Sequence, residues 1–279
     1  MEITIRRLST FEEYTAAEEL QQICWQTDPI DAVPAHLLLT LQSEAGLVLG
    51  AFTPRGELIG FLFGFLGREG NALKHCSHMA AVHPYYRDRN LGYRLKLAQR
   101  SFMLQEGLEI CTWTYDPLEA RNAVLNIAKL GATASIYKRN IYGQRLGGLN
   151  AALPTDRFHV RWEVNSPRVQ HCVTTGQRAT APIAAQSEQI LTRVVLQNDL
   201  PILAATGPLP ASDTIGVQIP AHMQRVKRDN VGAASHWRMG TRALFENAFR
   251  AGYTVVNATP DAGYPEHLVV YTLVREPEK

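Results

Sequence analysis

The sequence has little of what marks disulfide-rich, secreted or membrane proteins. Its four cysteines, Cys24, Cys76, Cys111 and Cys172, lie far apart and form no CxxC pair, so neither a disulfide framework nor a zinc knuckle is indicated. No run of about 18 apolar residues predicts a membrane span, and the first eight residues carry charges in place of the apolar core of a secretion signal. We therefore expect a cytoplasmic protein with reduced thiols and no membrane contact.

Excess charge and the common catalytic motifs are also missing. The formal net charge is +2, which is too small for the basic surface that binds nucleic acid. The chain has no GxxxxGK phosphate loop, no HExxH zinc helix and no GxSxG nucleophile elbow. Its nine histidines show no compact ligand spacing. We predict neither a nucleic-acid partner nor a metal.

The composition is that of a packed protein, with 46% hydrophobic and 19% charged residues among 279. This length fits two domains of ordinary size. A Thr/Ala/Gln-rich stretch at 174–186 is the candidate linker. We expect a first domain at 1–166, a linker or long loop at 167–189 and a second domain at 190–279.

Apolar periodicity predicts most of the secondary structure. Predicted strands span 3–8, 47–52, 58–66, 74–82, 109–114, 158–164, 190–196, 214–219, 253–258 and 268–274. Predicted helices span 11–26, 36–42, 91–105, 117–130 and 233–251. Strand pairs that flank helices in this order indicate an α/β (α+β) fold, a mixed sheet with helices packed on its faces.

The most informative segment is 79–95, where an apolar strand runs into a charged turn and then directly into a helix. Backbone N–H groups at a helix start, with the positive end of its dipole, suit the pyrophosphate of a nucleotide-containing ligand. Gly92 removes a side chain where a phosphate must approach the backbone, and Arg87, Arg89 and Arg94 add positive charge. An anion is the expected ligand.

This segment resembles the acyl-CoA-binding signature of the GNAT superfamily of N-acetyltransferases. Val82-His83-Pro84 and the run from Arg87 to Gly92 fall on its pattern, with Asn90 where a glycine is usual. Asparagine tolerates a left-handed turn, so we expect the loop to keep its shape. The resemblance covers residues 3–142 and implies a mixed, mostly antiparallel sheet flanked by helices.

The same resemblance implies which residues bind the cofactor, acetyl-CoA or another acyl-CoA such as succinyl-CoA. Backbone groups of Ala80, Ala81 and Val82 would pair with the pantetheine arm, which lies between parted strands like an inserted strand. The pyrophosphate would lie at Arg87, Asp88, Arg89, Asn90, Leu91, Gly92 and Tyr93.

Residues 111–118, followed by the Leu-Gly pair that ends at Gly131, resemble the second motif of the superfamily. More narrowly, they resemble an uncharacterised bacterial branch with a Trp-Thr-aromatic-Asp-Pro-Leu motif. Many members carry a tyrosine that protonates the CoA thiolate, but this chain has Ile127 at that position. Either Tyr137 or Tyr142 supplies the proton, or a thiol with a pKa of about 8.5 leaves without a protein acid.

A general base is needed to take a proton from the attacking amine. His78, four residues before Val82 and thus expected on the same strand face, and Asp116, after the next strand, are the candidates. Each has a structural alternative, since His78 also suits a core histidine and Asp116 a helix cap. Together with Tyr137 they form the predicted catalytic set.

In the second half a predicted helix leads into a strand, as it does after the loop at 87–92 in the first half. The turn before this helix, at 224–231, lacks the glycine pattern of that loop. We expect a degenerate GNAT-like half without a cofactor loop. Arg238 and Arg242, at i and i+4, share one helix face, either solvated or holding an acceptor carboxylate.

Two functions remain open on these observations. The first is an acyl-CoA-dependent N-acyltransferase, in which a small amine or amino acid attacks the thioester directly within a ternary complex. The second is a non-catalytic acyl-CoA-binding sensor or regulatory protein. The resemblance makes a homodimer reasonable.

Overall fold

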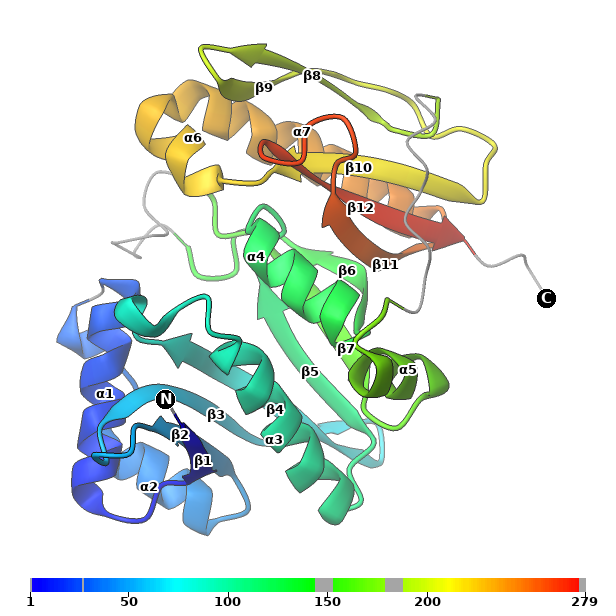
Figure 1. The fold of residues 1–279 in the computed structure, drawn as a ribbon. Coiled ribbons are helices and arrows are strands. Elements are labelled where there is room, and N and C mark those ends of the chain that lie inside the picture. The colour runs from blue at the N-terminus through cyan, green and yellow to red at the C-terminus, as the bar shows by residue number, and fades with distance from the viewer. Residues whose placement is uncertain (1, 27, 144–152, 179–187, 276–279) are drawn as a thin grey trace. The chain divides into compact units, whose positions relative to one another are not determined.

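The computed structural model describes residues 2–26, 28–143, 153–178 and 188–275, which form two compact units (Figure 1). Of these residues, unit 1 takes those up to Trp113 together with Glu163–Asn165, and unit 2 takes the others. The boundary therefore falls inside a strand, β5, and not at the predicted position, residue 166. The physical reason is that segments 133–138 and 157–163 are paired strands in the sheet of unit 2.

Unit 1 is a five-stranded sheet with three covering helices. Its elements are β1 (Thr4–Arg7), α1 (Phe11–Trp25), the 3-10 turn η1 (Pro29–Asp31), α2 (Ala35–Ser43), β2 (Leu47–Phe52), β3 (Leu58–Glu69), β4 (Ala72–Val82), the 3-10 turn η2 (Pro84–Tyr86), α3 (Leu91–Gln105) and the start of β5 (Ile110–Tyr115). The strands follow the order β1-β2-β3-β4-β5, antiparallel except for the parallel pair β4–β5.

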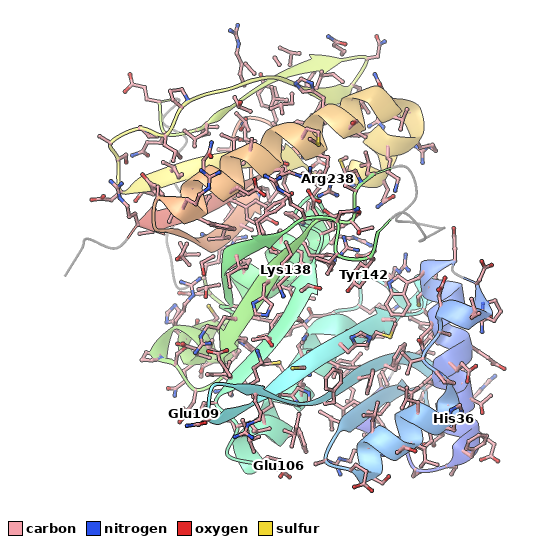
Figure 2. The ribbon with its side chains drawn as sticks, turned by 180° about the vertical axis from the view of Figure 1, so that it is seen from behind. His36, Glu106, Glu109, Lys138, Tyr142 and Arg238 are labelled. Atoms are coloured by element: carbon pink, nitrogen blue, oxygen red, sulfur yellow. The ribbon has the colours of Figure 1, made fainter. Side chains whose placement is uncertain are left out.

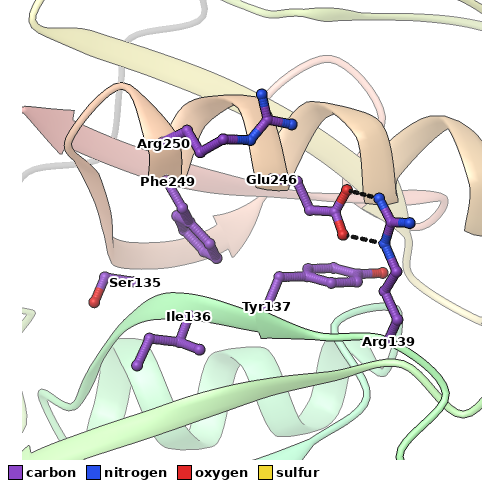
Figure 3. A pocket seen from close by; sticks show the side chains of 7 residues that line it. All are labelled: Ser135, Ile136, Tyr137, Arg139, Glu246, Phe249 and Arg250. Carbon is purple, nitrogen blue, oxygen red and sulfur yellow. Dashed lines mark hydrogen bonds and ion pairs between the residues drawn. The ribbon is translucent and has the colours of Figure 1, made fainter.

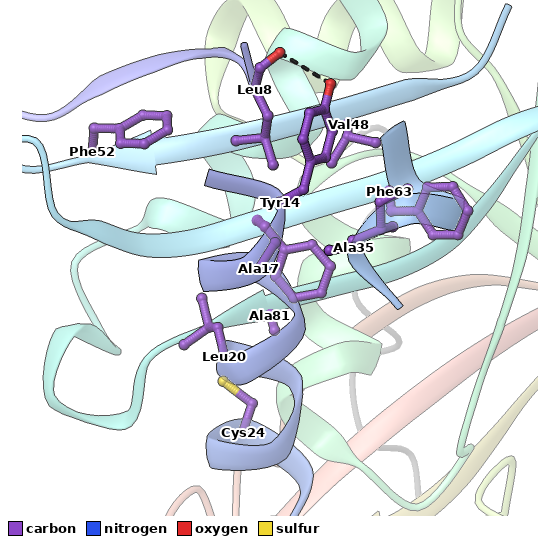
Figure 4. Close-up of a cluster of buried hydrophobic side chains, with 12 residues drawn as sticks. Leu8, Tyr14, Ala17, Leu20, Cys24, Ala35, Val48, Phe52, Phe63 and Ala81 are labelled. Atoms are coloured by element: carbon purple, nitrogen blue, oxygen red, sulfur yellow. Dashed lines mark hydrogen bonds between the residues drawn. The ribbon is translucent and has the colours of Figure 1, made fainter. Parts of the chain in front are cut away.

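Each face of this sheet has its own apolar core. On one face α1 and α2 bury residues such as Tyr14 and Leu38 against Phe61 and Phe63 of β3 (Figure 4). On the other face α3 contributes Leu91 and Leu95, which pack with residues of β2 and β3. The apolar periods read from the sequence thus correspond to real packing, and α3 is fixed directly behind β4.

Unit 2 contains an antiparallel sheet in the order β7-β6-β11-β12-β10, with a separate hairpin of β8 and β9. Its elements are α4 (Ala120–Ala123), the π-helix η3 (Val124–Lys129), β6 (Thr133–Lys138), β7 (Arg157–Glu163), α5 (Pro167–Thr175), β8 (Thr192–Gln197), β9 (Leu200–Thr206), β10 (Thr214–Pro220), α6 (Met223–Asp229), α7 (Val231–Arg250), β11 (Tyr253–Pro260) and β12 (Leu268–Arg275). Buried Trp237 of α7 donates its indole N–H to the Pro201 carbonyl at 2.9 Å, which fixes α7 to the β9 hairpin.

Several predictions for the second half need correction. The turn expected at 224–231 is largely the helix α6, and the first residues of the expected linker belong to α5, which Ser166 caps with its hydroxyl. Strands β6 and β9 were not predicted. Residues 179–187 of the expected linker lie outside the described residues.

The predicted fold class is confirmed, since mixed and mostly antiparallel sheets are flanked by helices. In unit 2, β10 precedes helices α6 and α7 and β11 follows them. These two strands do not pair with each other, because β12 lies between them in the sheet. None of the helices in the described ranges is long and apolar enough to cross a membrane.

Candidate functional site

The central feature of unit 1 is an opening between its two parallel strands. β4 and β5 pair only at His75–Cys111 and Cys76–Thr112. Within the described residues of unit 1, β4 then continues to Val82 with β3 as its one paired neighbour. One edge of β4 from Ser77 onward is therefore left without a strand partner in unit 1.

The ladder with β3 decides which backbone groups line this edge. The amide of His83 donates to the Ile59 carbonyl at 2.9 Å, and the register pairs Ala81 with Phe61. Because antiparallel pairs alternate, the polar groups of Ala81 are directed toward β3, whereas those of Ala80 and Val82 are directed toward the opening. Of the three predicted pantetheine contacts, the geometry leaves two available.

The turn after β4 has the backbone shape expected of an anion-binding loop. Asp88 and Asn90 have φ values of 64° and 59°, both left-handed. The first intrahelical bond of α3 runs from the Arg94 amide to the Asn90 carbonyl at 3.1 Å. The amides of Leu91 and Gly92 precede it and have no acceptor within the helix. Asparagine thus keeps the left-handed turn where a glycine is usual.

The three arginines of this region differ in their roles. Arg87 donates through Nε to the Val82 carbonyl at 3.3 Å, and the Arg89 guanidinium lies 5.3 Å from the ring centre of Tyr86. Both side chains are exposed. Arg94 instead donates to the Ile3 carbonyl at 2.6 Å and so ties α3 to the start of the chain. Arg87 and Arg89 remain the cations nearest the loop.

His78 lies on the opposite sheet face from the predicted one. The register of β4 shifts between Met79 and Ser77, so His78 is an extra, bulged residue. Its ring packs against Phe63 and Phe65 on the side of α1 and α2, whereas Val82 packs on the side of α3. The prediction assumed an unbroken period of two, which puts residues four positions apart on one face. The bulge breaks that period, so His78 and Val82 lie on opposite faces.

The exposed His78 is not a core histidine; that place belongs to His75, which is fully buried. Contact with the phenylalanine rings lowers the pKa of His78 by desolvation. A neutral imidazole at the bulge, next to the opening, has the protonation state that a base requires.

Asp116 and Tyr137, the other two predicted catalytic residues, belong to unit 2. Asp116 accepts the Leu118 amide at 2.9 Å and pairs with Arg238 at 2.5 Å. The Tyr137 hydroxyl donates to Asp156 at 2.7 Å, and burial followed by the Asp156 charge raises the pKa of Tyr137. Both groups are thus engaged in a network around α7. The helix-cap alternative for Asp116 is wrong, because the N-cap of α4 is Glu119 and Asp116 instead accepts the Leu118 amide in the turn before it.

The solvated-face interpretation of the α7 arginines is wrong. Arg238 is 2% exposed and lies on the side of α7 that faces the strands of unit 2 (Figure 2). Arg242 holds buried Asp156 through two hydrogen bonds of 2.7 and 2.9 Å. The Nε and Nη1 atoms of Arg238 have no hydrogen-bond partner among the described residues. These charges organise the interior of unit 2.

Unit 2 also has a surface hollow of about 410 Å³ between β6 and the last turns of α7. It is lined by Ser135, Ile136, Tyr137, Arg139, Glu246, Phe249 and Arg250 (Figure 3). Arg139 and Glu246 close one side through hydrogen bonds of 2.5 Å. Its lining offers no backbone donors at a helix start, so it does not suit a pyrophosphate.

One group of buried polar residues was not predicted from the sequence. Lys96, on α3, is 4% exposed and donates to Ser77 of β4 at 2.8 Å. The spacing of apolar residues in α3 could have flagged Lys96, because it falls next to the buried Leu95 on the face turned to the sheet. A lysine at such a position is rare without an acidic partner.

No family model matches the chain, and no curated protein matches it. The solved ribosomal-protein-S18-alanine N-acetyltransferase from Escherichia coli aligns at 18% identity and a TM-score of 0.47, covering 59% of this chain and 96% of that one. The PaiA N-acetyltransferase from Thermoplasma acidophilum, in complex with coenzyme A, aligns at 21% identity and a TM-score of 0.39, covering 58% and 99%. The chain is thus similar, over part of its length, to structures of N-acetyltransferases.

Proposed function

We propose that this protein is an acyl-CoA-dependent N-acyltransferase that acts on a small amine. The observation that carries the proposal is the open edge of β4, followed by the loop at 83–90 that leads to the start of α3. Ala80 offers a backbone donor and acceptor and Val82 a backbone donor to an extended arm, while the Val82 carbonyl already accepts from Arg87 and Cys24. The amides of Leu91 and Gly92 would face a pyrophosphate. An acyl-CoA thioester has these two parts in this order.

The length of the open edge bears on this placement. From Val82 to Ser77 the strand advances five residue steps, which is roughly 16 Å at about 3.3 Å per step. An extended arm that follows this edge from a pyrophosphate at the loop would run toward Ser77 and the bulge at His78. The thioester would lie where the strands begin to part.

In this arrangement His78 takes a proton from the acceptor amine. Its exposed ring can reach a nucleophile that approaches from the side of α1 and α2. The amine nitrogen then attacks the thioester carbon directly, the new C–N bond forms and the C–S bond breaks. Acetyl-CoA is the default donor.

Calorimetric titration with acetyl-CoA, succinyl-CoA and free CoA tests the binding, and release of free thiol over a panel of amines tests the transfer. Binding with thiol release supports the transferase. Binding without release over the whole panel would favour the sensor function, for which buried Ile127, in place of a hydroxyl-bearing residue, is the supporting observation. Absence of binding would refute both.

Two matched glycine variants test where the pyrophosphate lies. Gly92→Leu places a side chain at the second residue of α3, and Gly232→Leu does the same in α7, which has no such loop before it. We expect the first variant to lose CoA binding and the second to retain it, with both folded by circular dichroism. Equal affinities would contradict the placement at α3.

A further inference from the structure

The face of β4 turned to α3 carries a buried polar cluster directly at the opening. The Lys96 ammonium donates to the Ser77 hydroxyl at 2.8 Å and to the Gln99 side-chain carbonyl at 3.0 Å. It also lies 3.7 Å from the ring centre of Trp113 on β5. One lysine thus contacts both strands that part and the helix behind them.

Among the residues that the structure describes, this ammonium has no anionic partner. No ion pair joins Lys96 to a carboxylate within the ranges that the structure describes, although the side chain is almost fully buried. Burial lowers the pKa of Lys96 from 10.5 to about 8. An uncompensated buried cation costs stability, so a packed apolar side chain would serve the fold better. The position suits a group that works on an anion or transfers a proton.

Ser77 is the group that links Lys96 to the opening. It is the first β4 residue after the last pair with β5, Cys76–Thr112. Under the proposed function, on which this inference rests, the thioester sulfur lies at this point. Lys96 is therefore one hydrogen bond away from the place where the thiolate forms.

We propose that Lys96, acting through the Ser77 hydroxyl, supplies the proton to the departing CoA thiolate. When the C–S bond breaks, its electron pair stays on sulfur. The Ser77 hydroxyl gives its proton to sulfur and takes one from the Lys96 ammonium, which becomes a neutral amine. Solvent then returns a proton to Lys96, and His78 gives to solvent the proton that it took from the acceptor amine. The step needs no further reactant.

The surroundings leave Lys96 as the proton source in this cluster. From β4, burial lowers the pKa of His75 to about 4, so that imidazole is neutral. From β5, burial raises the pKa of Cys111 to about 11, so that thiol is protonated and uncharged. Gln99, on the same helix, is neutral. A lysine pKa near the value of about 8.5 for an ordinary thiol is well matched to the transfer.

The two proton-transfer groups also lie on opposite faces of the sheet. His78 packs on the side of α1 and α2, and Ser77 faces Lys96 on the side of α3. A nucleophile approaches a thioester from one face of its plane, so the base and the acid need separate positions. Consecutive residues of a strand alternate between its two faces, and the bulge decides that Ser77, and not His78, shares the α3 face with Val82.

The test compares binding of CoA with binding of desulfo-CoA, which lacks the sulfur, at a series of pH values. We consider the case in which Lys96 and the thiol of CoA share one proton in the complex. The ratio of the affinity for CoA to the affinity for desulfo-CoA then has its maximum at a pH between the pKa of Lys96, about 8, and that of the free thiol, about 8.5, and it falls at lower and higher pH. We expect a preference of about tenfold at the peak, as a charge-assisted hydrogen bond provides. Lys96→Met should abolish the peak, and Ser77→Ala should weaken it.

Lys74→Met, on the same strand, is the matched control and should leave the peak unchanged. A flat preference in the wild-type protein would overturn the proton-donor role while leaving acyl-CoA binding intact, and this result needs no variant to fold. A peak that persists in folded Lys96→Met would do the same. Failure of the wild-type protein to bind either compound would overturn the proposed function and the inference with it.

Discussion

Replacing Lys96 with methionine should change how the stability of unit 1 depends on pH, whatever the protein binds. The folded protein releases the Lys96 proton at about 8, whereas an unfolded chain keeps it up to 10.5. Between these values the unfolded state binds more protons. The free energy of unfolding therefore rises with pH across this window, and the cost of the buried charge is fully present below it.

The magnitude follows from the two pKa values. At about 1.4 kcal/mol per pKa unit, the rise from pH 8 to pH 10.5 amounts to about 3 kcal/mol. Methionine has a similar length and no charge, so Lys96→Met removes this dependence. The stability difference between wild type and variant should thus shift by about 3 kcal/mol in favour of the wild type as the pH rises.

Urea denaturation at several pH values, followed by circular dichroism and tryptophan emission, measures this difference. Lys138→Met, which removes an exposed lysine from β6 (Figure 2), is the control and should show no such shift. Parallel curves for wild type and Lys96→Met would refute the reasoning, because they would mean that burial does not perturb this ammonium.

Three further predictions concern the rest of the fold. Arg238→Met should lower the free energy of unfolding by about 3 kcal/mol in urea denaturation, because Asp116 loses its buried cation; a loss below about 1 kcal/mol would contradict this. Hydrogen bonds from Arg6 lower the pKa of Glu13 from 4.5 to about 2, so stability present above 4.5 is lost as the pH falls through 2. Since Arg6 is 43% exposed, Glu13→Gln should flatten an acid titration by only about 1 kcal/mol, and an unchanged slope would disprove it. Gly240→Ala would place a methyl 2.5 Å from a buried leucine of β9, so thermal unfolding should show destabilisation of about 1 kcal/mol; stabilisation, as in an open helix, would refute it.

Local sequence patterns were enough to find most elements of unit 1. The helix at 91–105 and the strand at 47–52 have the predicted bounds, and Thr10 accepts the Glu13 amide at the start of α1. Such elements are set by apolar period, capping and turn residues that act within a few positions. The helix expected at 117–130 is instead a short α-helix followed by a π-helix, since no local rule signals the wider turn.

The sequence by itself determined the strand, left-handed loop and helix start that suit a pyrophosphate, because residues 79–95 are contiguous and backbone geometry there is local. Only the tertiary structure decided the rest. The bulge that turns His78 away from the α3 face, the end of pairing after Cys76–Thr112 and the meeting of Lys96 with Ser77 all depend on register and on packing between distant segments. The engagement of Asp116 by Arg238 likewise joins residues 122 positions apart, a contact that no spacing in the sequence specifies.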